Sequence, residues 1–574
     1  MTAHPMLSER TLSERTLPEK PSPRVAPNVL SFERVCQVVA LLMGARCAFA
    51  GRHLPVGADG LSYLDVARAY VRHDWHTALN GFWGPLYTWL LALGMGGFHP
   101  GIRTELVMVR TLNFVLFAAA LYTFSRYWRA VAGWSKRTSG DQISIPLASP
   151  FVWITLGYLL FIATFAWFVD LVTPDILVAT IVFAIAAFLF KLNDRQQHGI
   201  AAYAWLGLLL ALGYYAKVIL LYFAVFVLGA MVVQGFRSGS LRRPMTAIVV
   251  FVVLVSPFVA ILSRAVGHFT AGDSGRLNYA WLVDGPETKT WMTAPHGGAP
   301  IPFYPGAIAF DSPPVFRLPM MEGVTYAPWY DAARFDKHSH PAFRLRGQLR
   351  RIAVNLQSLK EEIGGGTALF VPLLILVWYS PRASLRHLAA TWFCTLPAVG
   401  VVGMYLLVSV VPRYLLGFSL LLWGAALASV SVPPGLQLLA RRAMLAGTLV
   451  FAASVMPGLL HYVVSERTES TARDLAIAQA IPQFGIAPGD RVASIGDGQD
   501  AYWAHLAKVS VVAEIWSIDS ARFWSEPLAL QQAALRSMAD SGAKAVVWRG
   551  DSDQPCPPQW LSLPEHSGCM ISLH

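Results

Sequence analysis

The chain has 574 residues, of which 55% are hydrophobic and only 14% are charged, whereas a typical soluble domain has about a quarter charged residues. Its formal net charge of +11 comes largely from arginines in short segments between apolar runs, which indicates membrane topology and argues against nucleic acid as a partner. The first part of the chain, residues 1–31, is polar and proline-rich and contains the tandem LSERTLSERT. We expect it to be a disordered cytoplasmic tail rather than a cleaved signal peptide.

Repeated apolar segments follow, and their lengths of roughly 17–25 residues are those of helices that span a bilayer. They predict a mostly α-helical, polytopic transmembrane bundle of about eleven spans over residues 32–464. The block 200–233 is too long for one helix and predicts two spans that meet near the GYYAK run. The other spans are expected near residues 32–50, 105–124, 145–165, 174–190, 245–262, 367–378, 388–410, 414–428 and 444–464.

Basic residues between the spans predict the orientation. They all fall on one side if the N-terminus is cytoplasmic, and the positive-inside rule makes that side the cytoplasm. We therefore expect a multi-pass protein of the cell inner (plasma) membrane. The loops 51–104 and 263–364 and the C-terminal region 465–574 then lie outside the cytoplasm. The residues that carry this prediction include Arg24, Arg34, Arg126, Arg129, Lys136, Lys191, Arg195, Arg237, Arg242, Arg382 and Arg441.

Residues 465–574 are soluble in composition. The runs RVASIGDG, VSVVAEI and KAVVWRG read as strands between helical patterns, which predicts a small extracytoplasmic α/β domain. Cys556 and Cys569 are the only cysteines outside the expected spans. In an oxidising compartment they can form a disulfide, and two separate free thiols are the alternative.

The first outer loop, VGADGLSYLDVARAYVRHDWH, carries acids beside the bilayer. Apolar positions from Leu61 recur at helical spacing and predict a helix along the membrane surface. Asp65 is expected to form a solvated ion pair with Arg68 or Arg72. Asp59, at the helix start, either caps the helix or takes part in catalysis, and spacing alone leaves both open.

Metal binding has little support in this loop. His73 and His76 lie close together, but that spacing in a surface helix does not define a metal site, and we assign no metal ligand. The sequence establishes no cofactor, and a divalent cation is left open.

The order of several motifs makes the chain recognisable. An Asp after the first span, SYLDVARAY, HDW, NGFWGPLYTWLLAL and then an arginine early in the second span resemble the first outer loop of the GT-C membrane glycosyltransferases. The closest likeness is to the bacterial branch with aminoarabinose transferases and relatives of protein O-mannosyltransferases. Four further segments resemble those of the family and occur in the same order: LVTPDILVATIVFAIAAFL, GLLLALGYYAKVILL, PFVAILSRAVGHFTAGDSGRLNYAW and VPRYLLGFSLLL. The resemblance spans roughly residues 35–430.

The resemblance implies a function. The family transfers a sugar from a polyprenyl-phosphate donor on the outer membrane face, and its acid after the first span is the general base or positions the acceptor; this role falls on Asp59. The expected partners are the lipid-linked donor, membrane lipid, and a glycan, lipid or protein acceptor. The chain departs from aminoarabinose transferases at Phe82-Trp83-Gly84-Pro85-Leu86, where they carry an acidic-Lys-Pro-Pro-Leu run, so the phosphate-contacting lysine of that run is absent.

The chemistry itself points to further residues. A lipid-phosphate leaving group needs cations to hold its charge. Lys217 lies at the break between two spans, where it either binds phosphate or extends to water. Asp170 and Asp175 border the turn before the fourth expected span; Asp170 is expected to be solvated, and Asp175 either caps a helix or serves as a second acid. The other candidate donor-binding cations are Arg264, Arg276 and Arg413.

These residues predict an inverting glycosyltransferase, because a single displacement needs one base and no covalent intermediate. The alternatives are a transporter or flippase of lipid-linked glycans, or a protein that binds them without transfer. A transporter favours charges at mid-bilayer and internal repeats, whereas the charges here cluster toward one face.

Overall fold

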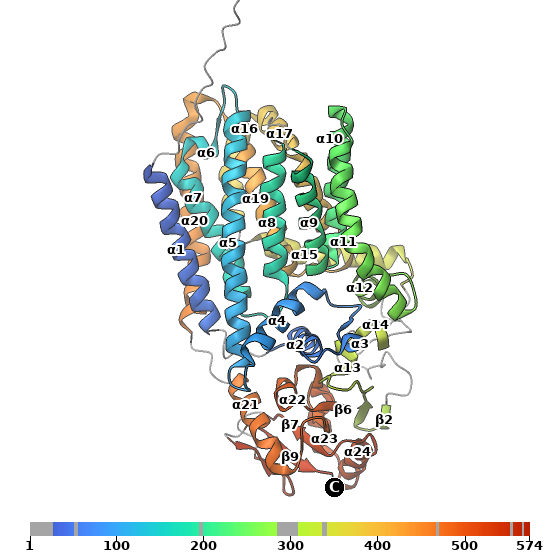
Figure 1. Ribbon diagram of the computed structural model, residues 1–574. Helices are drawn as coiled ribbons and strands as arrows, with labels where there is room; N and C mark the ends of the chain where they lie inside the picture. The colour runs from blue at the N-terminus through green and yellow to red at the C-terminus, as the bar shows by residue number, and fades with distance from the viewer. Residues whose placement is uncertain are drawn as a thin grey trace, which may run out of the picture.

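The computed structural model of the chain describes residues 27–50, 56–193, 199–283, 308–335, 341–364, 366–465, 470–550, 555–564 and 567–573. Figure 1 shows a bundle of long helices with a smaller sheet-containing unit at one end. We call that end of the bundle the sheet end. The first helix, α1 (Pro27–Ala50), begins inside the expected disordered tail, so the predicted boundary after residue 31 is wrong by several residues. Residues 1–26 of that tail lie outside the described part.

Apolar helices form the bundle, as predicted. Seven described helices are long and apolar enough to cross a membrane, or eight if the bent pair α16 (Thr367–Tyr379) and α17 (Pro381–Ala390) counts as one. About eleven spans are not confirmed, because α9 and α18 have 17 residues each and the bent pair turns by 110°. Besides α16 and α17, the bundle contains α1, α5 (Glu105–Thr138), α6 (Ile145–Ala148), α7 (Pro150–Phe165), α8 (Asp175–Leu192), α9 (Ile200–Ala216), α10 (Ile219–Ser238), α11 (Arg242–Val266), α18 (Trp392–Val408), α19 (Pro412–Ser429) and α20 (Gln437–Val464).

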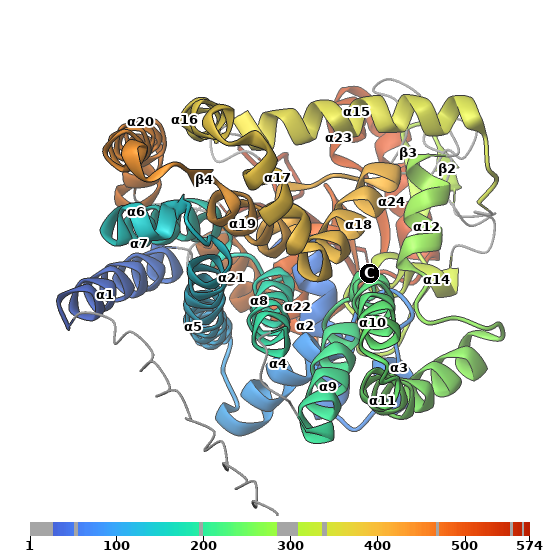
Figure 2. The same ribbon diagram turned by 90° about the horizontal axis from the view of Figure 1, so that it is seen from above.

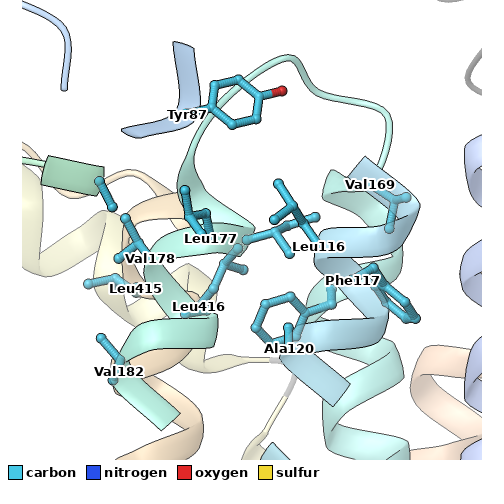
Figure 3. Packing of buried hydrophobic residues seen from close by; sticks show 14 of the residues in the cluster. Tyr87, Leu116, Phe117, Ala120, Val169, Leu177, Val178, Val182, Leu415 and Leu416 are labelled. Atoms are coloured by element: carbon cyan, nitrogen blue, oxygen red, sulfur yellow. The ribbon is translucent and has the colours of Figure 1, made fainter. Parts of the chain in front are cut away.

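The centre of the bundle is formed by α5, α8 and α19. Figure 3 shows Leu116 and Phe117 of α5 beside Leu177 of α8, with Leu416 of α19 next to them. A small residue lets α19 approach α8 closely: a Cβ at Gly417 would lie 3.0 Å from the Cα of Ala179. Small residues at such contacts are how membrane helices gain packing energy when lipid removes the hydrophobic driving force.

Short helices from the two long loops cover the sheet end. The first loop forms α2 (Ala58–Val71), α3 (Trp75–Ala78) and α4 (Pro85–Phe98), which lie between the bundle and the sheet (Figure 1). Figure 2 shows α15 crossing one side of the bundle, where the guanidinium of Arg351 donates to the Val408 carbonyl at 2.7 Å. The second loop contributes α12 (Ser274–Leu282), α13 (Ala327–Tyr330), α14 (Ala332–Phe335) and α15 (Leu345–Gly364).

The sheet unit has seven strands in the order β2-β3-β6-β5-β7-β9-β8. Strands β5 (Arg491–Ile495), β6 (Ser510–Ile515) and β7 (Ala545–Trp548) are the three predicted strands, and β5 pairs in parallel with both neighbours. The remaining elements are β8 (Leu561–Ser562), β9 (Cys569–Ser572), α21 (Ser470–Ala480), α22 (Tyr502–Ala507), α23 (Ser517–Ser525) and α24 (Leu528–Asp540).

The predicted domain boundary at residue 465 misses part of this sheet. The hairpin β2 (Ile308–Asp311) and β3 (Pro314–Arg317) belongs to the second loop, yet β3 pairs with β6. An open edge of β6 would expose unpaired backbone groups, and the hairpin covers it. The residues 465–574 therefore do not form the sheet alone.

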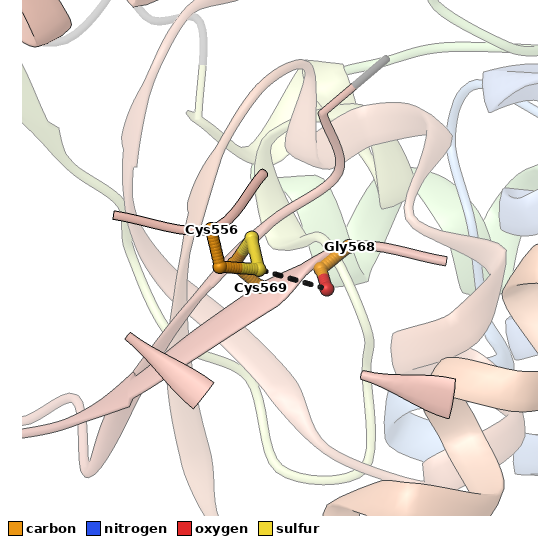
Figure 4. Close-up of a disulfide and its surroundings, with 3 residues drawn as sticks. All are labelled: Cys556, Gly568 and Cys569. Atoms are coloured by element: carbon orange, nitrogen blue, oxygen red, sulfur yellow. Dashed lines mark hydrogen bonds between the residues drawn. A yellow bond between two sulfur atoms is a disulfide. The ribbon is translucent and has the colours of Figure 1, made fainter. Parts of the chain in front are cut away.

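The predicted disulfide between Cys556 and Cys569 is present, with Cα atoms 5.7 Å apart (Figure 4). This separation is within the range of disulfide geometry. The bond ties the segment after β7 to β9, which lies between β7 and the edge strand β8.

Candidate active site

A cavity of about 640 Å³ lies at the sheet end of the bundle, where the ends of several helices meet the two loops. Its lining combines apolar side chains of α10 and α18 with a group of charged side chains. Five of the six site residues predicted from the sequence line it: Asp59, Asp175, Lys217, Arg276 and Arg413. These residues come from five different elements, so only the tertiary structure brings them together.

Asp59 lies in the first turn of α2 and does not cap it. The N-cap is Gly57, which forms no side-chain cap hydrogen bond. The Asp59 carboxylate instead accepts a hydrogen bond from the guanidinium of Arg413 and another, at 3.2 Å, from the indole of Trp329. A carboxylate in the first turn is also favoured by the helix dipole. The side chain keeps 24% of its surface exposed, so the carboxylate faces the cavity rather than the protein interior.

Lys217 and Asp175 form the second half of the same charge network. Lys217 follows the last residue of α9, and its ammonium lies 2.7 Å from the Asp175 carboxylate and 3.7 Å from the centre of the Tyr414 ring. Asp175 is the first residue of α8, whose N-cap position is Pro174. Its other oxygen lies 3.7 Å from the Arg413 guanidinium. Arg413 thus bridges Asp59 and Asp175 in one continuous chain of charges.

A third ion pair also lines the cavity. Asp273 is 2% exposed and precedes α12; one of its oxygens lies 3.3 Å from Arg276 and 3.1 Å from His268. The cavity lining therefore contains three carboxylates and three permanent cations, each of them in an ion pair. An incoming phosphate can displace a carboxylate from its cation, because phosphate oxygens accept strong charge-assisted hydrogen bonds from ammonium and guanidinium groups.

Two residues named from the sequence, one cation and one acid, do not line the cavity. Arg264 is exposed near the end of α11 and does not line the cavity. Asp170 is 4% exposed and accepts a hydrogen bond from Tyr462, so the expectation that it is solvated is wrong. Among the described residues, no group of three or more His, Cys, Asp or Glu side chains is placed to hold a metal ion.

Sequence reasoning missed the aromatic and second-loop residues of the site. Tyr63, Trp83 and Tyr414 line the cavity, and the indole of Trp329 donates a hydrogen bond to Asp59. The density of Trp and Tyr in the loops was the available signal. Asp273 was also accessible to reasoning, because it lies three residues before Arg276.

The prediction for Asp65 is wrong. Asp65 is 1% exposed and accepts hydrogen bonds from the Thr325 backbone at 2.7 Å and the Thr325 hydroxyl at 3.0 Å. Arg68, its expected partner, instead pairs with Glu105 of α5 at 3.2 Å. Helix α2 is not an exposed surface helix, because the second loop and α22 cover the face that its periodicity presents as polar.

His505 joins the sheet unit to the bundle. It lies on α22 with no exposed surface, its Nδ1 is 2.7 Å from Asp65, and its Nε2 is 3.1 Å from Glu105. Only the protonated imidazole can donate from both nitrogens. Burial and the guanidinium of Arg68 lower the pKa of His505, but Glu105 and Asp65 outweigh them, and the pKa is raised above its ordinary value.

We expect this contact to weaken as the pH rises. A raised folded-state pKa means that His505 contributes stability below its unfolded pKa of about 6.5, and that this contribution is lost as the pH rises through the folded value. The thermal unfolding midpoint of the full chain in detergent should therefore fall, as the pH rises above about 6.5, by more than that of His505→Gln.

The pH window matters for this measurement. Burial also raises the pKa of Asp474 and of Glu514 to about 7 each. The stability that these two carboxyls contribute is therefore lost as the pH rises from about 4 to 7. Equal falls in the unfolding midpoint above about pH 6.5 in the parent chain and in His505→Gln would contradict the role assigned to His505.

The sheet unit also touches the site directly. Asp500, which precedes α22, accepts a hydrogen bond from the backbone N–H of Ala58, the residue next to Asp59. Burial, together with the nearby charges of Asp497 and Asp59, raises the pKa of the Asp500 carboxyl. The start of α2 is therefore held from the sheet side while Asp59 faces the cavity.

These features define a polytopic helical protein with an ion-paired, partly apolar cavity at one end of its bundle. Solved structures of similar fold include ArnT from Cupriavidus metallidurans bound to undecaprenyl phosphate, at 15% identity and a TM-score of 0.41, with 96% of this chain and 99% of that chain covered. Another is the oligosaccharyltransferase of Archaeoglobus fulgidus in the apo form, at 12% identity and a TM-score of 0.48, with 90% of this chain and 69% of that chain covered. No family model and no curated protein matches the chain.

Proposed function

We propose that the chain is an integral membrane glycosyltransferase of GT-C type. It moves one sugar from a polyprenyl-phosphate donor to a glycan, lipid or protein acceptor on the extracytoplasmic face of the inner membrane, with inversion at the anomeric carbon. One observation carries this proposal: the charge chain Asp59–Arg413–Asp175–Lys217 and the apolar side chains of α10 and α18 line the same cavity.

The cavity suits both halves of such a donor. The apolar stretch includes Ile219 and Leu221 of α10 and Met404 of α18, which suit an isoprenoid chain. Lys217 and Arg413 lie at helix ends beside it, where a phosphate can reach them. Cations at this point stabilise the negative charge that builds up on the leaving phosphate as the sugar departs.

The acids supply the other part of the reaction. In the proposed mechanism the donor phosphate competes with Asp59 for Arg413, and this frees the Asp59 carboxylate to accept the proton of the acceptor hydroxyl. The acceptor oxygen bonds to the anomeric carbon as the bond to the phosphate oxygen breaks, and the lipid phosphate leaves with the electron pair. Asp175 keeps Lys217 and Arg413 in place beside the leaving group.

The transporter alternative has less support. The ion-paired residues lie at the ends of helices α2, α8, α9 and α19, all at the sheet end. A transporter that binds its substrate near the bilayer midplane needs charges there instead. The direct test incubates the purified chain with radiolabelled polyprenyl-phosphate sugars and a range of glycan, lipid and peptide acceptors. Sugar-labelled product supports an enzyme; movement of intact donor across vesicles without product would favour a transporter.

Lys217→Met should weaken donor binding. Removing one charge-assisted contact costs about 1.5–3 kcal/mol, so the Kd for polyprenyl phosphate should rise about 10- to 100-fold. Lys136→Met, an exposed lysine near the opposite end of α5, is the matched control and should leave the Kd unchanged. A Lys217→Met variant that binds polyprenyl phosphate as tightly as the control would remove Lys217 from the donor site.

A further inference from the structure

A second cavity, of about 540 Å³, lies in the sheet unit and shares no residue with the first. Its lining comes from α23 and α24, from β7 and β9, and from the segment 555–560. Figure 1 places α24 and β9 at the end of the molecule farthest from the bundle. The volume falls in the range of about 300–1,000 Å³ that small-molecule sites occupy.

Three tryptophans from three separate segments form one wall of this cavity. The ring centre of Trp524 lies 4.4 Å from that of Trp548 and 5.2 Å from that of Trp560. Trp548 is 7% exposed and belongs to the core, whereas Trp524 and Trp560 are partly exposed. The indole nitrogen of Trp524 is buried without a hydrogen-bond partner among the described residues. A pyranose ring presents C–H bonds on one face, so that face can stack on such rings.

Amide side chains form the polar part of the lining. Gln531, Gln532 and Gln559 carry groups that both donate and accept hydrogen bonds, as sugar hydroxyls do. Gln559 adopts a φ of +81°, which is unusual for a residue other than glycine and concentrates at functional sites. No described lining residue is charged. An ionic ligand would find no counter-charge in this lining, which favours a neutral one.

The disulfide holds the polar side of the cavity in place. Cys556 lies between two lining prolines, Pro555 and Pro557, and is bonded to Cys569 on β9 (Figure 4). Prolines and a cross-link restrict the segment that carries Gln559 and Trp560. Such restriction improves affinity, because less conformational freedom is lost on binding.

We propose that this cavity binds a neutral saccharide, as the recognition site for a glycan acceptor. A second copy of the chain is a poorer occupant, because stable interfaces bury about 1,200–2,000 Å² and this feature is a concave pocket. The inference rests on the proposed function for the role of the saccharide, whereas binding itself requires neither the donor nor the first cavity.

The test measures binding of neutral trisaccharides of mannose, glucose, galactose and N-acetylglucosamine to the full chain in detergent, without donor. Trp560→Ala should weaken binding at least about tenfold, and Gln532→Ala, an exposed position, by about fivefold. Matched controls are Trp75→Ala and Gln483→Ala, which replace exposed residues outside both cavities and should leave binding unchanged. A galacturonate trisaccharide should bind more weakly than its neutral counterpart.

Three results would overturn the inference: no neutral trisaccharide binds, binding survives both Trp560→Ala and Gln532→Ala, or the charged trisaccharide binds better. Asp59→Asn separates this inference from the proposed function. If Asp59→Asn and the parent chain bind saccharide equally and neither transfers sugar, only the proposed function fails. If the parent transfers sugar and no saccharide binds at the tryptophans, only the present inference fails.

Discussion

Replacing Asp59 with asparagine should reduce the rate of sugar transfer by about 10²- to 10⁴-fold, the usual contribution of a general base. Asparagine has nearly the same shape and can still accept from Trp329 and Arg413, so the cavity should keep its structure. The variant cannot take up the proton of an acceptor hydroxyl. The measurement is initial transfer rate at saturating donor, together with the Kd for polyprenyl phosphate, which should not rise, because the phosphate no longer competes with a carboxylate for Arg413.

The control for this variant is Asp74→Asn in the same loop. Asp74 caps α3 by accepting from the Thr77 backbone at 3.1 Å, and it does not line the cavity. Its replacement should leave the transfer rate within about twofold of the parent. Asp59→Asn with full activity would assign the carboxylate a structural role. Loss of donor binding together with activity would show that Asp59 positions the phosphate-binding cations rather than the acceptor proton.

Replacing Asp65 with alanine should destabilise the attachment of the sheet unit by about 3–5 kcal/mol, the cost of leaving a buried charge without its partner. Asp65 has almost no exposed surface and joins α2 to Thr325 of the second loop and to His505 of α22. Its loss leaves the Nδ1 of His505 and two Thr325 donors without their partner. We expect a lower thermal unfolding midpoint and faster proteolytic release of the region after α20.

The control for Asp65→Ala is Asp74→Ala, which gives the free-energy cost of losing a single cap hydrogen bond. Loss of its cap hydrogen bond should cost about 1 kcal/mol. If Asp65→Ala lowers the free energy of unfolding no more than Asp74→Ala does, the buried network is not what holds the sheet unit on the bundle. Combining Asp65→Ala with His505→Gln should cost less than the sum of the two single changes, because both remove the same contact.

The sequence by itself determined the properties that depend on local composition. Hydrophobic runs, strand patterns and cysteine spacing are visible in short windows of sequence. They predicted the apolar helices, the three central strands β5, β6 and β7, and the pair Cys556 and Cys569. The break at Lys217 was also predicted, because two spans must be separated by a polar turn.

Tertiary structure alone decided which charges meet. Asp59 and Arg413 are 354 residues apart in sequence, and Asp65 and His505 are 440 apart. The periodicity of α2 indicates that it has a polar face but not what covers that face. Asp65 was therefore predicted to be solvated, although the second loop and α22 bury it. The same limit applies to the sheet, whose edge is completed by β3 from the second loop. Local sequence specifies an element and its faces, whereas the partner of each face depends on the path of the whole chain, because contacts between distant segments leave no mark in either segment's own pattern.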